Sequence, residues 1–329
     1  MSSRALVFGL ASALAGASAA VACGDEPATT QKTTDPTIGD DGGIVSRDDA
    51  AGLPDVRQPD PPLGPCTPDR PFMPKGLLEG ARFVADQAWP KLSRDETVLV
   101  FTSTRLGPAN VYMSTRESAA VPFPTGSLRN DFDLGATPPA QVALGPDGLS
   151  AVFTRTTSPA TDSDLMFTKR DNAEVGFEPA TALSDVNEVG KDESMPFVSL
   201  DGATLYFVSN RTGTPQIYAA DKVSGKFTGR RAVLDAASAE EAVSPVLSAD
   251  GLLLFFSANR VGTTGGRDIF VASRPTAQSP FGAATRVVEL STTRDDYPGW
   301  LSPDGCRLYY HAKIGAEGRW AVYLAERVR

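Results

Sequence analysis

The sequence predicts an all-β fold, a five-bladed β-propeller of four-stranded antiparallel blades. Three observations support it: a hairpin motif recurs five times, a phenylalanine precedes each hairpin at a nearly constant distance, and the first phenylalanine has no hairpin before it. A six-bladed ring is the alternative. A sixth blade needs roughly another 50 residues, and residues 24–71 contain no alternating apolar pattern that could supply it.

The clearest copy of the hairpin spans Asp192–Tyr218. Asp201-Gly202 lies between two apolar runs, a pattern typical of a type I′ turn, in which both central residues have positive φ. We expect strands at Met195–Ser199, Thr204–Val208 and Gln216–Ala220. A hairpin alone cannot bury its apolar face, so its recurrence decides the fold.

The turn acid recurs at intervals of about 50 residues, at Asp95, Asp147, Asp201, Asp250 and Asp304. A β-rich run follows each acid, at Thr97–Thr102, Leu149–Thr154, Thr204–Val208, Leu252–Ser257 and Arg307–His311. The phenylalanines that open a further short apolar stretch are Phe72, Phe123, Phe177, Phe227 and Phe281. Four strand candidates per repeat suit a propeller blade.

The phase of the repeat predicts how the ring closes. The first phenylalanine unit, Phe72–Leu78, comes before the first hairpin, and the strand candidate Trp320–Ala325 follows the last hairpin. We expect the Phe72 strand to complete the last blade, because closure removes a free sheet edge.

The phrases PFVSLDGATLYFVSNR, SPVLSADGLLLFFSANR and PGWLSPDGCRLYY resemble the WD-repeat-like propeller repeats of TolB-type periplasmic proteins. The resemblance covers residues 72–329 and implies a propeller without implying one function. Glu96 stands where the repeat has Gly, and Gly145 where it has Ser. Because TolB-type rings have six blades and a separate N-terminal domain, a role in the Tol system is not carried over.

The N-terminal part of the chain predicts export. Residues 1–22 read as a lipoprotein signal peptide, and Cys23 as the lipidated first residue. Ordinary cleavage that leaves Cys23 a free thiol is the alternative. Residues 23–71 are an acidic, Pro-rich segment that we expect to be a disordered linker, followed by the propeller at 72–329. The expected location is the cell envelope, lipid-anchored to the outer membrane and facing the periplasm or the surface.

Charge and composition limit the classes of partner. The net charge is −9 and no basic stripe is present, which disfavours nucleic acid and confines membrane contact to the lipid anchor. The single histidine, His311, excludes a His-based zinc triad and disfavours a Ser-His-Asp site. We expect no cofactor, no metal and a monomer.

Two cysteines remain after Cys23. Cys66 lies just before the predicted closing strand and Cys306 begins a strand of the last blade. In an oxidising compartment, we predict a disulfide that staples the closure. Two free buried thiols are the alternative, because a sequence does not fix the Cα separation.

Charged residues also recur around each hairpin. The acids before the turn are Asp86, Asp192, Glu241 and Asp295, and the bases after it are Arg105, Arg155, Arg211, Arg260 and Lys313. Folding at the turn makes them near cross-strand neighbours on the face opposite the turns. They are either ion pairs that pin loops or a charged ring around the channel. Trp89, Tyr297 and Asp296 join them at the closure and suit a peptide or sugar ligand, or packing between blades.

These observations favour a lipid-anchored envelope propeller that acts as a protein- or peptide-binding or scaffold module, and not as an enzyme. The alternative is a carbohydrate-binding or glycan-cleaving propeller, a hydrolase or lyase that uses paired carboxylates. Asp131, Asp133 and Asp296 depart from the repeat, but nothing in the sequence marks them as a pair.

The anchoring hypothesis is tested on the mature protein. We expect mass spectrometry of the N-terminal peptide to find a diacylglyceryl group on Cys23, and Cys23→Ala to move the protein from the membrane to the soluble fraction. An unmodified Cys23 in membrane-purified protein contradicts the hypothesis.

Overall fold

The computed structural model describes residues 66–80, 85–132, 141–156, 162–234, 240–315 and 318–327. The signal peptide, Cys23 and nearly all of the linker lie outside these residues. The chain divides into two units, Met1–Pro59 and Asp60–Arg329, and every described residue belongs to the second. Within the described part, no helix is long and apolar enough to span a membrane.

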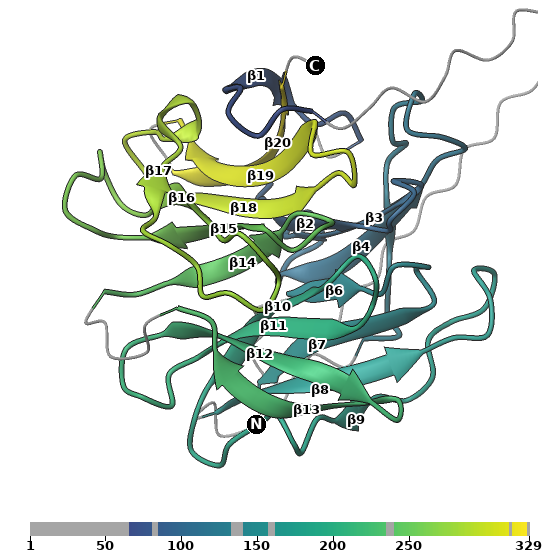
Figure 1. Cartoon of the computed structure of the whole chain (residues 1–329). Coiled ribbons are helices and arrows are strands. Elements are labelled where there is room, and N and C mark those ends of the chain that lie inside the picture. Colours follow the sequence, from purple (N-terminus) through teal and green to yellow (C-terminus); the bar gives the residue numbers. More distant parts are fainter. Residues whose placement is uncertain are drawn as a thin grey trace, which may run out of the picture. The chain divides into compact units, whose positions relative to one another are not determined.

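Five sheets of four antiparallel strands confirm the five-bladed propeller (Figure 1). Blade 1 contains β2 (Gln87–Leu92), β3 (Val98–Ser103), β4 (Asn110–Thr115) and β5 (Ser127–Leu128). Blade 2 contains β6 (Val142–Leu144), β7 (Ser150–Thr156), β8 (Ser163–Lys169) and β9 (Thr181–Ala182). Blade 3 contains β10 (Glu193–Val198), β11 (Thr204–Ser209), β12 (Gln216–Val223) and β13 (Lys226–Ala232).

Blades 4 and 5 complete the ring. Blade 4 contains β14 (Val243–Leu247), β15 (Leu253–Ala258), β16 (Asp268–Ser273) and β17 (Thr285–Arg286), followed by the 3-10 helix η1 (Val288–Leu290). Blade 5 contains β18 (Asp296–Leu301), β19 (Arg307–Ile314), β20 (Arg319–Arg327) and, from the other end of the chain, β1 (Phe72–Leu77).

The hairpins are present, but the predicted type I′ turn is wrong. The amide of Gly202 donates to the Ser199 carbonyl at 2.8 Å, and the amide of Ser199 donates to the Thr204 carbonyl at 2.8 Å. Only Gly202 has positive φ, at 73°. The turn is therefore of type I with a left-handed glycine after it, which adds residues to the loop without losing the hairpin.

The turn acid caps its own turn, which explains why serine and aspartate recur together. Asp201 accepts hydrogen bonds from the Ser199 hydroxyl at 2.5 Å and the Ala203 amide at 2.9 Å. The Ser199 hydroxyl in turn accepts from the Thr204 amide at 2.9 Å. In blade 2 the serine is replaced by Gly145, and the Ser150 hydroxyl from the facing strand occupies the space that its side chain would need.

The recurring phenylalanine is explained by a base that sequence analysis missed. Each phenylalanine ring lies under a base from the end of the third strand, at 4.0 to 5.7 Å from its centroid. The pairs are Arg116–Phe123, Arg170–Phe177, Lys222–Phe227, Arg274–Phe281 and Arg327–Phe72. The contact joins the outer part of a blade to its third strand by a cation–π interaction.

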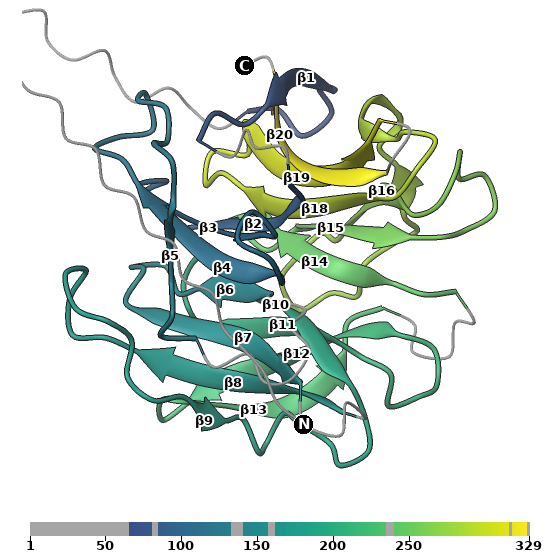
Figure 2. The same cartoon turned by 180° about the vertical axis from the view of Figure 1, so that it is seen from behind.

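The N-terminal strand closes the ring, as predicted. β1 pairs antiparallel with β20, from Phe72 opposite Arg327 to Leu77 opposite Tyr323 (Figure 2). A disulfide joins Cys66 to Cys306, with a Cα–Cα distance of 5.1 Å. The amide of Cys66 also donates to the carbonyl of Asp304 at 2.8 Å. The closing strand is therefore held along its length and at its start.

Glu96 makes a second connection across the closure, between blades 1 and 5. Its carboxylate accepts from the Arg307 guanidinium at 2.9 Å and from the Tyr309 hydroxyl at 3.0 Å. Glu96 has a φ of 59°, in the region that the other four turns fill with glycine. The backbone conformation of Glu96 is unfavourable for a residue other than glycine. Its ion pair with Arg307 of blade 5 offsets this cost.

We expect the disulfide to stabilise the closed ring. Cys66→Ser should lower the free energy of unfolding by about 2–5 kcal/mol, because the disulfide constrains a long loop of the unfolded chain. Denaturant unfolding of the oxidised protein measures this. Cys306→Ser is the matched control and should cost the same, and the double variant should cost no more than either. Additive costs would contradict a shared bond as the cause.

Candidate functional site

The inner strands of the blades are bulged at one equivalent position. Trp89, Met195 and Ser244 each have a φ between 50° and 57°, each precedes a proline, and each interrupts the pairing register of its strand. Left-handed backbone is unfavourable for these residue types, so surrounding contacts must hold it. A bulge redirects side chains at the centre of the ring.

The bulged positions contact the next blade. Gln141, at the same position of blade 2, accepts a hydrogen bond from the Met195 amide at 2.9 Å. The Ser244 hydroxyl donates to the Pro298 carbonyl of blade 5 at 2.8 Å. The strained residues therefore join neighbouring blades around the axis.

The residues at the bulge of each inner strand, and two positions after it, are mostly apolar. At the bulge they are Trp89, Gln141, Met195, Ser244 and Pro298, and two residues further along each strand they are Lys91, Ala143, Phe197, Val246 and Trp300. None of these is a carboxylate, and Lys91 is the one residue among them that titrates.

Lys91 is buried beside the single histidine without a carboxylate partner in the described hydrogen bonds and ion pairs. Its ammonium donates to the Gly299 carbonyl at 2.8 Å and lies 5.3 Å from the Phe197 ring centroid. Burial lowers the pKa of Lys91 to about 7. Burial, and then the positive charge of Lys91, hold the pKa of His311 well below its usual value.

The aromatic residues predicted for a binding face pack against one another. The ring of Tyr297 stacks on His311 at 5.0 Å, and Trp89 and Trp320 lie 5.3 and 5.5 Å from Tyr297. Tyr297 is 5% exposed. Of the two interpretations of Trp89 and Tyr297, this geometry favours packing between blades 1 and 5.

Asp296 is also buried. It accepts hydrogen bonds from the Thr292 amide at 2.6 Å and the Thr292 hydroxyl at 3.1 Å. Burial raises the pKa of Asp296 to about 7. Asp131 forms an ion pair with Arg129 and accepts from the Phe177 amide at 2.9 Å. Asp133 lies outside the described residues. Asp131 and Asp296 thus each have a structural contact.

The predicted cross-strand pair of acid and base forms in blade 5, between Lys313 and Asp295 at 2.6 Å. The described contacts of blades 1, 3 and 4 show other partners, so the intra-blade ion pair between the recurring acid and base does not form in these three blades. Among the acids, Asp86 accepts from the Trp320 amide, Asp192 pairs with Asn210, and Glu241 pairs with Arg267. Among the bases, Arg105 donates to the Gly126 carbonyl, Arg155 lies opposite Asp164, Arg211 pairs with Glu193, and Arg260 pairs with Glu240.

Four of the five recurring bases have a different contact in common, which the sequence signals only through an aromatic residue in the third strand. Arg105 lies 3.6 Å from the Tyr112 ring centroid, Arg211 4.6 Å from Tyr218, Arg260 5.5 Å from Phe270, and Lys313 4.8 Å from Trp320. A guanidinium over an aromatic ring stabilises the loop that carries it. Their recurrence therefore has a structural cause.

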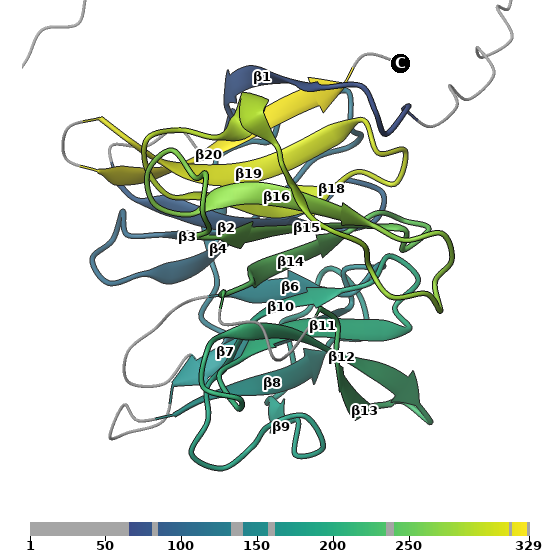
Figure 3. The same ribbon diagram turned by 60° about the vertical axis from the view of Figure 1, so that its left-hand side comes forward.

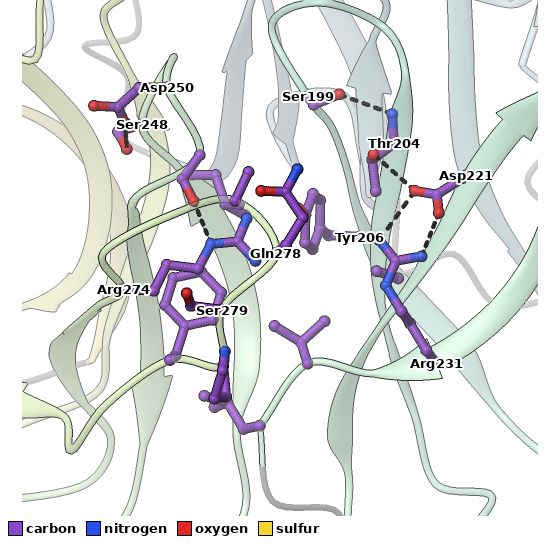
Figure 4. Close-up of a pocket in the computed structure, with 18 of the residues that line it drawn as sticks. Ser199, Thr204, Tyr206, Asp221, Arg231, Ser248, Asp250, Arg274, Gln278 and Ser279 are labelled. Atoms are coloured by element: carbon purple, nitrogen blue, oxygen red, sulfur yellow. Dashed lines mark hydrogen bonds and ion pairs between the residues drawn. The ribbon is translucent and has the colours of Figure 1, made fainter.

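The main cavity of the described residues lies on the opposite face, between blades 3 and 4 (Figure 4). It is a groove of about 970 Å³ beside the turns that contain Asp201 and Asp250. Its apolar lining includes Ala219, Val233, Leu234, Leu247 and Phe281. The sequence favoured the face at the open ends of the hairpins, so the groove is a site that sequence analysis missed.

Polar side chains form two walls of this groove. On one side, Asp221 pairs with Arg231 at 2.5 Å and accepts from the Thr204 hydroxyl at 3.0 Å. On the other side, the Arg274 Nε donates to the Gly251 carbonyl at 2.7 Å. Its guanidinium, Tyr206 and Gln278 converge in the middle of the groove (Figure 4).

Arg274 differs from its equivalents in blades 1 and 2. Arg116 and Arg170 donate through a terminal nitrogen to loop carbonyls, those of Val121 and Ala173, both at 3.1 Å. Among the described residues, Arg274 donates through Nε to the Gly251 carbonyl, and its guanidinium lies in the groove near Tyr206 (Figure 4). This arginine can therefore donate hydrogen bonds to a bound molecule.

No family model and no curated protein matches this chain. Among solved structures, a thermostable family-43 glycoside hydrolase has a TM-score of 0.53 at 12% identity, over 76% of this chain and 91% of that one. TolB from Acinetobacter baumannii has a TM-score of 0.49 at 18% identity, over 74% of this chain, and the match spans 55% of that protein. A putative TolB from Agrobacterium tumefaciens has a TM-score of 0.45 at 18% identity, over 74% of both chains. At these identities the likeness concerns the fold alone.

We expect Lys91→Met to stabilise the propeller at pH 7 by about 1–3 kcal/mol, because it removes a buried charge that has no opposite charge. The folded pKa of Lys91 is about 7, below the unfolded value of 10.5. The unfolded state therefore binds more protons between these values, and wild-type stability rises from pH 7 to pH 10.5.

The advantage of Lys91→Met over wild type should accordingly shrink as the pH rises through this window, as measured by denaturant unfolding. Ala143→Met is a control at the same level of the axis without a charge, and its effect should not depend on pH. A difference between Lys91→Met and wild type that stays constant up to pH 10 would rule out the charge as the cause.

Proposed function

We propose that this protein is a non-catalytic binding module of the cell envelope, which captures a protein or peptide segment in the groove between blades 3 and 4. The observation that carries the proposal is the groove itself. Its floor is apolar, and Arg274, Gln278 and Tyr206 offer hydrogen bonds at its centre. Binding sites commonly combine apolar lining with a few convergent polar groups.

The chemistry at the centre of the ring supports binding over glycan cleavage. Glycoside hydrolysis uses two carboxyl groups that flank the scissile bond. Among the described residues, the inner strands carry two buried carboxylates, at the first residue of β10 and of β18, and both are held by neighbouring side chains. Of the buried acids nearby, Glu193 pairs with Arg211 at 3.0 Å, and Asp296 is held by Thr292.

Anchoring through Cys23 is part of the proposal, and the place where the chain enters the propeller is consistent with it. The amide of Cys66 donates a hydrogen bond to the carbonyl of Asp304, in the turn of blade 5. The first described residue therefore lies on the face that also holds the groove.

Site-specific photocrosslinking in cells tests the proposed face. A photoreactive residue at Gln278, which is exposed at the groove, should give discrete adducts with another protein. The matched control is Leu106, which is 67% exposed in a loop at the opposite face. Arg274→Ala should weaken the adducts formed from position 278.

Adducts from position 106 alone would contradict the groove as the site. Release of reducing ends from polysaccharide by the purified protein would contradict the non-catalytic part and favour the glycan-cleaving alternative.

A further inference from the structure

The outer strand of blade 3 differs from its counterparts. β13 has seven residues, whereas the outer strands of blades 1, 2 and 4 have two each. Its sequence explains the difference: Ser224 and Gly225 both have positive φ, at 48° and 82°, so they form a tight two-residue hairpin from β12. Because the turn has only two residues, β13 begins directly after β12 and pairs with it from its first residue.

The far edge of β13 is free among the described strands. The sheet order is β10-β11-β12-β13, so β13 pairs with β12 alone, and it lies on the outside of blade 3 (Figure 3). Five of its residues are exposed, and Phe227 is buried. An exposed strand edge is a template on which an extended chain can add another strand.

The charge along this edge is positive in an acidic protein. Lys226, Arg230 and Arg231 lie on β13, and Lys222 lies on the neighbouring strand. Two acids offset them, because Arg231 pairs with Asp221 at 2.5 Å and Arg230 pairs with Glu188 at 3.6 Å. Lys222 and Lys226 therefore leave this edge positive by two charges, on a chain whose net charge is −9.

This charge separates two kinds of occupant. A second copy of the chain, added antiparallel through its own β13, would place bases opposite bases, which is destabilising. An acidic strand added to the same edge would place acids opposite the bases of β13, so like charges would not repel.

We infer that β13 is a strand-addition site for an extended, acidic segment of a partner protein. Backbone hydrogen bonds along β13 supply affinity, and Lys226, with Lys222 on the neighbouring strand, selects for glutamate or aspartate on the added strand. Arg231 and Asp221 also form one wall of the groove between blades 3 and 4, but strand addition uses the backbone edge of β13 and requires no groove ligand.

Fluorescence anisotropy on the full mature chain tests this inference. The probe is a fluorescein-labelled peptide of alternating glutamate and threonine. We expect it to bind in low salt, to bind more weakly as salt is added, and to outcompete a peptide with lysine in place of glutamate. Lys226→Glu should weaken binding about tenfold, which corresponds to about 1.4 kcal/mol.

Two controls separate strand addition from general charge attraction. Lys75→Glu changes the same charge on β1, the other long outer strand, and should alter the affinity less than about twofold. The same acidic peptide with alternate backbone nitrogens methylated keeps its charge but cannot pair as a strand, so it should not bind.

Absence of binding to the wild-type protein would overturn the inference, as would equal binding of the methylated peptide or an equal effect of Lys75→Glu. A result in which the acidic peptide fails while crosslinks still form at Gln278 would refute this site and leave the groove proposal intact.

Discussion

A ring of five blades depends on one event, the return of the N-terminal strand to the last blade. Until β1 pairs with β20, blade 5 has three strands and the ring has an open edge. The disulfide at Cys66 and the contacts of Glu96 with blade 5 both act on this junction. The closure therefore combines a covalent bond, a strand pair and an ion pair.

Closure of only five blades crowds the axis. The inner strands bulge at Trp89, Met195 and Ser244, and the next residues inward fill the centre with Phe197, Trp300 and their neighbours. A filled axis leaves little room for a ligand there. The groove between blades 3 and 4 lies away from the axis, where the outer parts of two sheets diverge around apolar side chains. The space between blades 3 and 4 therefore has room for a ligand, whereas the mouth of the central channel has little.

The repeat was predictable because it rests on local chemistry. Asp-Gly turns, their spacing and the unmatched Phe72 unit were enough to predict five blades and the closing strand. The turn type was mistaken because an Asp-Gly pair also fits a type I turn followed by a left-handed glycine. The charged residues were misread for a different reason. Arg211 and Arg260 form ion pairs and aromatic-ring contacts with residues that lie near them only after the sheets have packed. The groove and the buried Lys91 depend on how blades meet, which no local pattern encodes.

Amide hydrogen exchange of the oxidised protein, resolved over β1, tests the closure most directly. If closure holds the ring together, the amides of Phe72–Leu77 that bond to β20 should exchange as slowly as those of β19, through global unfolding. Reduction of the disulfide should speed exchange in β1 and in blade 5 together. Fast exchange of β1 while β19 and β20 stay protected would show that the ring is stable without its closing strand, and would contradict this account.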